Sequence, residues 1–151
     1  METIMTELVL FTPTEKKKCP AKIEWSQKDD GDCEKIRVSV TLGGVCYFGD
    51  GEDYMWADAF ADLQRNLPSN VSLACCMTCR HGNMCPFGNE PRQLFCTKDL
   101  TITDKDDMIA LFEAEDAFGK REVLADAYCN DFEYQSDNCY TYNDYLFCLQ
   151  S

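Results

Sequence analysis

Cysteine is the residue type that most clearly offers chemistry in this sequence. The chain has 151 residues and 11 cysteines, of which seven lie between positions 75 and 139. Cys76 and Cys79 are separated by two residues, a spacing that lets both sulfur atoms point at the same metal ion. A tetrahedral zinc or iron ion needs two further thiolates. The pair therefore predicts half of a metal site.

Cys96 and Cys129 are the two single cysteines that we expect to complete this site. Together with the pair they would fasten the polar segments 80–95 and 97–128, which carry few core residues of their own. Part of the folding free energy would then come from metal binding. The predicted metal ligands are Cys76, Cys79, Cys96 and Cys129, with zinc as the expected metal and an iron–sulfur cluster as the alternative.

Two other cysteines near the pair, Cys75 and Cys85, need a separate interpretation. Cys75 adjoins Cys76, and in an extended backbone adjacent side chains point in opposite directions, so Cys75 is expected to be a core residue. Cys85 is the rival fourth ligand, because its Cys-Pro-Phe-Gly context predicts a turn that brings the sulfur back toward Cys79. Arg80 and the backbone amides near Gly82 are expected to offset the negative charge of a zinc tetrathiolate.

A resemblance rests on these motifs. Cys76-x-x-Cys79 is followed by Arg-His-Gly, a later Phe-Cys pair ends at Cys96, and Cys129 begins a closing Cys-x-Asp-Phe-Glu run. This pattern, over residues 75–133, resembles the short four-cysteine modules of many uncharacterised bacterial proteins. The resemblance implies metal binding, through iron–sulfur clusters in some relatives and zinc in others. The chain departs from the pattern in its extra cysteines, at positions 75 and 85, and in the long gap between Cys96 and Cys129.

Two interpretations without a bound metal stay open. The thiols could be reduced core residues that pack as small hydrophobes, or they could form a reactive redox pair. The redox interpretation needs Cys76 at the start of a helix, which Gly82 and Pro86 disfavour. His81 is the only histidine, so most hydrolytic mechanisms with a histidine base are excluded. The sequence predicts no enzymatic activity.

The charge distribution indicates a second kind of function. The formal net charge is -13, and residues 99–151 carry 13 acidic residues against 3 basic ones. A negative field of this strength disfavours nucleic acids and anionic membranes and favours a basic protein partner. An acidic inhibitor or immunity-type protein without metal is therefore the alternative to a metal-binding protein.

The location of the protein is expected to be cytoplasmic. The apolar run 8–11 is far shorter than a secretory signal, and no other segment is long enough to span a membrane. Eleven cysteines in such a chain favour reduced thiols or metal ligands over a disulfide framework.

The elements that must position the thiols are predicted from periodicity. Alternating apolar residues predict strands over 8–11, 21–25 and 36–42, and Gly43-Gly44 predicts a tight hairpin into a strand at 45–48. Apolar residues at helical spacing predict a helix from Trp56 to Leu67, stopped by Pro68. A short strand is expected at 70–74 and a second helix at 104–113, with Thr103 as its N-cap.

The expected fold class is therefore α+β. An antiparallel β-meander would be covered by one or two helices, and a cysteine-rich loop module would follow. At this length we expect a single domain, 1–151, in three parts. These parts are the meander and helix at 1–74, the cysteine-rich module at 75–133, and an acidic aromatic tail at 134–151.

Overall fold

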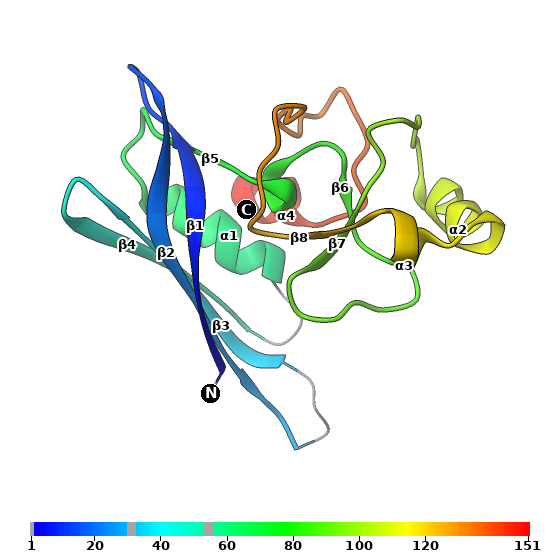
Figure 1. Ribbon diagram of the computed structural model, residues 1–151, viewed down its shortest axis with the longest axis horizontal. Coiled ribbons are helices and arrows are strands. Elements are labelled where there is room, and N and C mark those ends of the chain that lie inside the picture. The colour runs from blue at the N-terminus through cyan, green and yellow to red at the C-terminus, as the bar shows by residue number, and fades with distance from the viewer. Residues whose placement is uncertain (1, 30–32, 53–55) are drawn as a thin grey trace. The chain divides into compact units, whose positions relative to one another are not determined.

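The computed structural model describes residues 2–29, 33–52 and 56–151, with only the backbone of Cys33 (Figure 1). The chain forms two compact units. Unit 1 contains residues 1–74 together with 144–151, and unit 2 contains residues 75–143. Each unit is described by itself below.

Unit 1 is built on an antiparallel five-stranded sheet with the order β4-β3-β2-β1-β5. The strands are β1 (Glu2–Phe11), β2 (Lys16–Gln27), β3 (Cys33–Leu42), β4 (Val45–Glu52) and β5 (Ser72–Ala74). Leu42 pairs with Val45, and Gly43 and Gly44 turn the chain with φ angles of 58° and 79°. Glycine adopts these angles without steric cost, as the predicted hairpin requires. The predicted α+β meander is confirmed.

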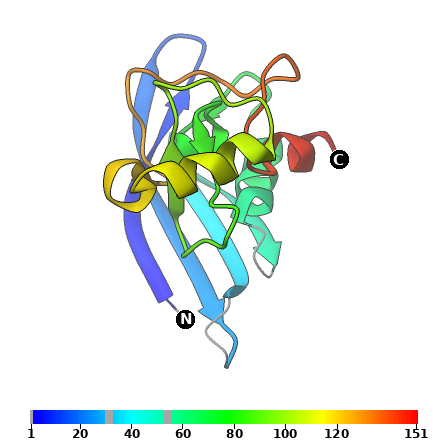
Figure 2. The same ribbon diagram turned by 90° about the vertical axis from the view of Figure 1, so that its right-hand side faces the viewer.

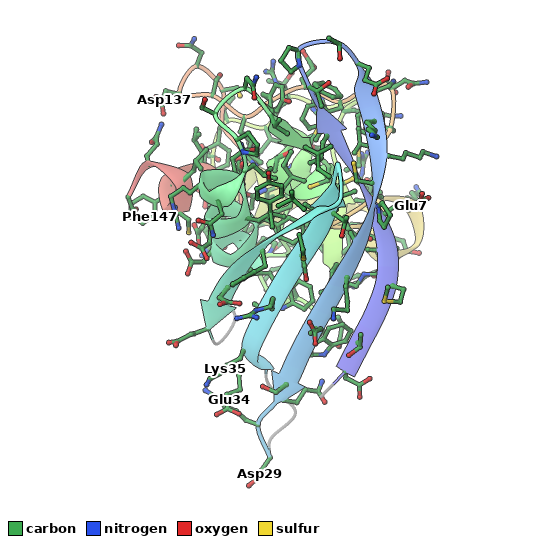
Figure 3. The ribbon with its side chains drawn as sticks, turned by 90° about the vertical axis from the view of Figure 1, so that its left-hand side faces the viewer. Glu7, Asp29, Glu34, Lys35, Asp137 and Phe147 are labelled. Atoms are coloured by element: carbon green, nitrogen blue, oxygen red, sulfur yellow. The ribbon has the colours of Figure 1, made fainter. Side chains whose placement is uncertain are left out.

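The two faces of this sheet follow the alternation of the sequence. Ile36, Val38 and Val40 are buried, whereas Arg37 between them is exposed. Arg37 donates to the two carboxylate oxygens of Asp50 on β4 at 2.7 and 3.0 Å. Figure 3 looks onto this face, which carries charged side chains along its length. One face therefore forms the core of unit 1, and the other is hydrophilic.

Helix α1 (Trp56–Asn66) packs against the sheet and confirms the predicted helix. Its Phe60 and Leu63 are completely buried. The helix lies so close to β4 that a Cβ atom at Gly49 would come within 2.3 Å of backbone atoms of α1. Helix α4 (Tyr145–Gln150), which the sequence does not predict, packs on α1, and Arg65 donates to the carbonyl of Cys148 at 2.7 Å.

Unit 2 contains little regular structure. A 3-10 turn, η1 (Cys76–Thr78), is followed by β6 (Gly82–Asn83), β7 (Gln93–Cys96) and β8 (Glu122–Leu124), which form a sheet of order β6-β7-β8. Helices α2 (Lys105–Ala114) and α3 (Ala117–Lys120) connect β7 to β8, as seen from two directions in Figures 1 and 2. No helix in the described ranges is long and apolar enough to cross a membrane.

Helix α2 confirms the predicted second helix but corrects its N-cap. Asp104, and not Thr103, is the N-cap, with an extended backbone and a side chain that accepts a hydrogen bond from the Asp107 amide at 3.0 Å. Thr103 precedes the cap, and both its amide and its hydroxyl donate to the Asp107 carboxylate at 2.8 Å. Thr and Asp are both good caps, so residue type alone does not separate them.

A bidentate ion pair joins two distant segments of unit 2. Arg92 Nε and Nη2 donate to the carboxylate of Asp126 at 2.9 and 3.0 Å, and the Asp126 side chain is 3% exposed. Arg92 adopts a positive φ of 65°, and its carbonyl accepts a hydrogen bond from the Ala125 amide at 2.8 Å. Positive φ is costly outside glycine, so surrounding contacts must hold Arg92 in place.

The acidic aromatic tail is divided between the units. Residues 134–143 belong to unit 2, where Gln135 donates to the carbonyl of Met77 at 2.8 Å and Asn143 donates to that of Gly82 at 2.6 Å. Residues 144–151 belong to unit 1 and contain α4. Both pieces are therefore bound to folded structure.

Candidate metal centre

The Cys-x-x-Cys pair lies on and just after the turn η1. The Cys79 amide donates to the Cys76 carbonyl at 3.2 Å, which closes the turn. The amides of Cys76 and Met77 donate to the carbonyls of Ala127 and Ala125 at 2.8 and 2.9 Å. The turn is thus fixed to the segment that leads directly to Cys129.

The structure brings the four predicted thiols into one neighbourhood. Cys76, Cys96 and Cys129 line one pocket of about 680 Å³. Burial is the main cause that raises the pKa of Cys76, and nearby Cys79, Cys129 and Cys96 raise it further. Burial also raises the pKa of Cys79, with Cys96 and Cys129 adding to the effect. Three segments far apart in the sequence therefore contribute thiols within electrostatic range of one another.

The thiols are not in ligand contact with one another. In the described part of the chain, no set of three or more His, Cys, Asp or Glu side chains has the spacing of a metal site. Zinc–sulfur bonds of about 2.3 Å require all four sulfur atoms to converge on one point. Metal binding would therefore have to draw the side chains inward, and the metal site stays a prediction.

Backbone amides point at the sulfur of Cys79. The His81 amide donates to Cys79 Sγ at 3.5 Å, and the Glu133 amide also bonds to this sulfur, which lowers the pKa of Cys79 against the larger effect of burial. Hydrogen bonds to the charged form favour a thiolate. Cys79 thus has built-in donors for the state in which cysteine binds metal.

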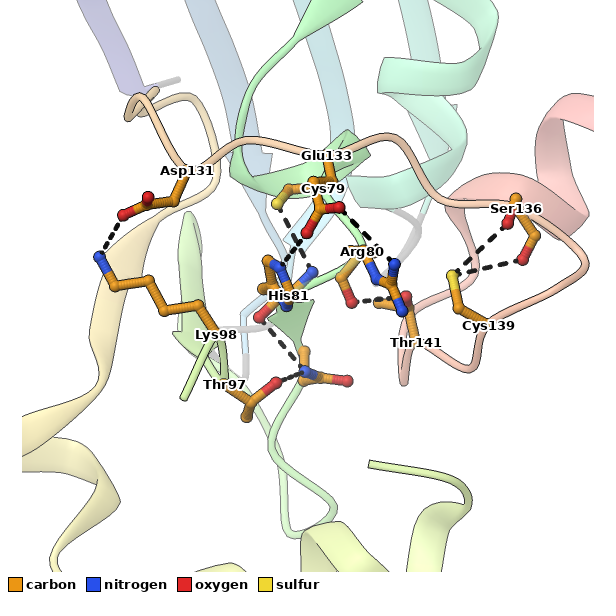
Figure 4. A network of polar contacts seen from close by, with 11 residues as sticks. Cys79, Arg80, His81, Thr97, Lys98, Asp131, Glu133, Ser136, Cys139 and Thr141 are labelled. Atoms are coloured by element: carbon orange, nitrogen blue, oxygen red, sulfur yellow. Dashed lines mark hydrogen bonds and ion pairs between the residues drawn. The ribbon is translucent and has the colours of Figure 1, made fainter. Parts of the chain in front are cut away.

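Lys98, Lys120 and Arg121 line the same pocket as Cys76, Cys96 and Cys129, whereas Arg80, the expected cation, is not among its lining residues. Lys98 Nζ binds Asp131 Oδ2 at 2.8 Å, and its pKa is raised first by Asp131 and then by Cys129 and Cys96 (Figure 4). Arg80 pairs with Glu133 at 3.7 Å. The position of Lys98 two residues after Cys96 is the only sequence signal for its role, and it is a weak one.

His81 is linked to the closing segment of the module. Its Nε2 lies 3.0 Å from Glu133 Oε2, and its side chain is 17% exposed (Figure 4). Thr141 donates to the carbonyl of Arg80 at 2.7 Å, and Arg80 donates its amide to the Glu133 carbonyl at 2.8 Å. These contacts hold residues 79–81 against residues 133–141 and give the histidine a structural position beside the thiols.

The two other cysteines of the cluster lie in core environments. Cys75 is fully buried, as expected, and burial raises the pKa of its thiol to about 12. Cys85, the rival ligand, is 5% exposed and belongs to an apolar cluster with Phe95 and Ala117. Each of the ten cysteines whose side chains are described is a free thiol.

Comparison with known proteins identified no relative of this chain. No family model, curated protein or solved structure matches the chain. Function must therefore be argued from the residues and their geometry.

Proposed function

We propose that this protein is an acidic cytoplasmic zinc protein in which a structural metal ion organises unit 2 for binding to another protein. The zinc ligands are Cys76, Cys79, Cys96 and Cys129. The observation that carries the proposal is that Cys76, Cys96 and Cys129, from three separate segments, line one pocket, with Cys79 within electrostatic range of them. A random set of core cysteines has no reason to gather in this way.

Electrostatics supports a cation at this position. Burial and mutual proximity raise the pKa of Cys76 and Cys79, so without metal these two thiols are neutral at pH 7. A divalent zinc ion bound by four thiolates would leave a site of charge -2. Lys98 and the amides of His81 and Glu133 lie where they would offset that charge.

The topology gives the metal a structural role. The described strands of unit 2 are short, and the longest of them, β7, has four residues. A zinc ion would cross-link the η1 turn, the end of β7 and the loop before Asn130, and it would close two long loops. Loss of the metal is therefore expected to loosen unit 2 and to leave the sheet of unit 1 intact.

The test combines metal analysis with serine substitution. Protein purified without oxygen should contain about one zinc ion per chain. Cys76→Ser and Cys79→Ser should each lose the metal, and amide exchange should then increase across unit 2. Cys139→Ser is the matched control, because Cys139 lies in unit 2 and bonds to Ser136. Unchanged metal content and stability in both ligand variants would refute the proposal.

The same experiment separates zinc from an iron–sulfur cluster, which would use the same four thiolates. A brown protein with visible absorption that is lost in Cys79→Ser would assign a cluster. A colourless protein that retains zinc would exclude it. The fold of unit 2 would depend on the metal in either case.

A further inference from the structure

Unit 2 exposes a group of phenylalanine rings that includes none of the proposed metal ligands. Phe87 is 68% exposed and Phe118 is 51% exposed, and Phe112 lies between them with ring centroids at 6.4 and 5.4 Å. All three belong to the loop and helices around the buried ring of Phe95, whose centroid lies 4.9 Å from Phe112 and 5.2 Å from Phe118. We call Phe87, Phe112 and Phe118 the phenylalanine patch. Most large apolar side chains gain about 1.5–3 kcal/mol from full burial, so such exposure needs an explanation.

The patch is held rigidly. The loop of Phe87 is closed by hydrogen bonds from the Cys85 amide to Asn89 Oδ1 at 2.7 Å and from the Phe87 amide to Cys85 Sγ at 3.4 Å. Helix α3, which carries Phe118, is capped by Asp116, which accepts from the Gly119 amide at 3.0 Å. A surface that is already ordered loses little conformational entropy when a partner binds.

The rings meet edge to face. The interplanar angles within the patch and to Phe95 lie between 77° and 82°. In this arrangement the edge of one ring contacts the face of the next, so the rings present both kinds of surface. Exposed aromatic faces attract guanidinium and ammonium groups. The patch can therefore accept apolar side chains and cations together.

The charge around the patch is negative. Residues 99–121 contain seven acidic residues against Lys105, Lys120 and Arg121, and Arg121 pairs with Asp99 and Glu115. Glu113 directly follows Phe112, and Asp116 lies two residues before Phe118. An acidic surface of this kind attracts a basic partner and repels an acidic one.

We infer that the phenylalanine patch is the docking surface for a basic protein segment that combines lysine or arginine with large apolar side chains. The partner's apolar side chains would cover the exposed rings, and its cations would pair with the surrounding carboxylates. This inference deepens the proposed function and rests on it, because the zinc ion would stabilise β7, which carries Phe95. The patch itself contains none of the proposed metal ligands.

A designed peptide tests the inference. The probe is a short amphipathic peptide of lysine and leucine, and a glutamate–leucine peptide of equal length is the control. The lysine peptide should bind, with salt weakening the complex, and amide shifts in NMR spectra should cluster at the patch. Binding that is absent, or shifts spread evenly over the acidic surface, would overturn the inference.

Variants sharpen the test. Phe118→Ser should weaken peptide binding about tenfold. Because Phe118 also packs on Phe95, Glu113→Lys provides a second variant that changes charge at an exposed position and should weaken binding several-fold. Phe147→Ser and Glu7→Lys are matched controls in unit 1 and should bind as the parent does. Equal binding by all four variants would overturn the inference.

Metal analysis of the same samples separates the two proposals. A chain that contains zinc but does not bind the lysine peptide would overturn the docking surface alone. A chain that binds the peptide at the patch without containing metal would support the docking surface and overturn the zinc proposal.

Discussion

Gly82 offers a direct test of how tightly the η1 turn is held. A Cβ atom built on Gly82 would lie 1.9 Å from the carbonyl oxygen of Cys76 and 2.9 Å from its carbonyl carbon. Both are backbone atoms, so no side-chain rotation relieves the clash. Gly82 is itself fixed by a hydrogen bond from its amide to the Cys79 carbonyl at 3.1 Å and by pairing with Cys96. Gly82→Ala must therefore displace the turn that carries the Cys-x-x-Cys pair.

The size of the effect follows from this distance. Real Cβ contacts are almost never shorter than 3.0 Å. The Cys76 carbonyl oxygen must therefore move at least about 1 Å away from the new Cβ atom. Overpacking of a rigid interior costs about 1–3 kcal/mol, and a backbone clash belongs at the upper end. For a unit of this size, a loss of about 2 kcal/mol lowers the Tm by about 10 °C. Displaced ligands should also weaken zinc binding by about 10- to 100-fold.

The assay compares Gly82→Ala with Gly88→Ala, another glycine substitution in unit 2. Gly88 has a φ of 118° and no atom within 4 Å of an added Cβ, so its substitution costs backbone strain of about 1 kcal/mol without a clash. Thermal unfolding measures stability, and competition with a chromogenic chelator measures zinc affinity. If the two variants have the same Tm and the same zinc affinity, the close packing of Gly82 on the η1 turn is refuted.

Three further predictions follow from other contacts. Arg92→Gln leaves the buried Asp126 carboxylate without its guanidinium, so urea denaturation should show a loss of about 3 kcal/mol, and a loss below about 1 kcal/mol would contradict the prediction. Phe60→Ala removes a fully buried ring of unit 1 and should cost about 3–5 kcal/mol by the same assay, with the hydrophilic-face variant Arg37→Ala much milder. Hydrogen bonds from Thr103 lower the pKa of Asp107 below its ordinary 3.8, so its stabilisation of α2 is present above that pH and is lost as pH falls through the lowered value. The protection factors of the α2 amides, which correct for the intrinsic exchange rate at each pH, should therefore fall on acidification, and Asp107→Asn should remove this part of the pH dependence.

Local patterns predict most of unit 1. Strand β3 alternates without interruption, and Gly43-Gly44 admits the hairpin whatever surrounds it, because positive φ is a property of the residue itself. Helix α1 is predicted from the sequence because its apolar residues repeat at helical spacing. Helix α4 is not predicted, since a segment of six residues is too short to be a stable helix alone and forms one where α1 offers a surface to pack on.

One part of the candidate metal centre is likewise predicted from the sequence, and the other part depends on the tertiary structure. The spacing of Cys76 and Cys79 on the sequence is enough to predict a shared direction for two sulfurs, because a turn of two intervening residues has few conformations. Whether Cys96 and Cys129 approach them is a tertiary matter. It is decided by the pairing of Gly82 with Cys96 and by the hydrogen bond from the Cys76 amide to Ala127, which joins residues about 50 positions apart.

The sequence by itself determined the strands of unit 1, the hairpin, the two longest helices and the cysteine pair, because each depends on residues close in the chain, whereas β6, β7 and β8 were not predicted. The tertiary structure alone decided that Cys96 and Cys129 line one pocket with Cys76, that Lys98 lines it as well, and that the phenylalanine rings form one exposed patch. These features depend on contacts between distant segments, and no local periodicity encodes such contacts.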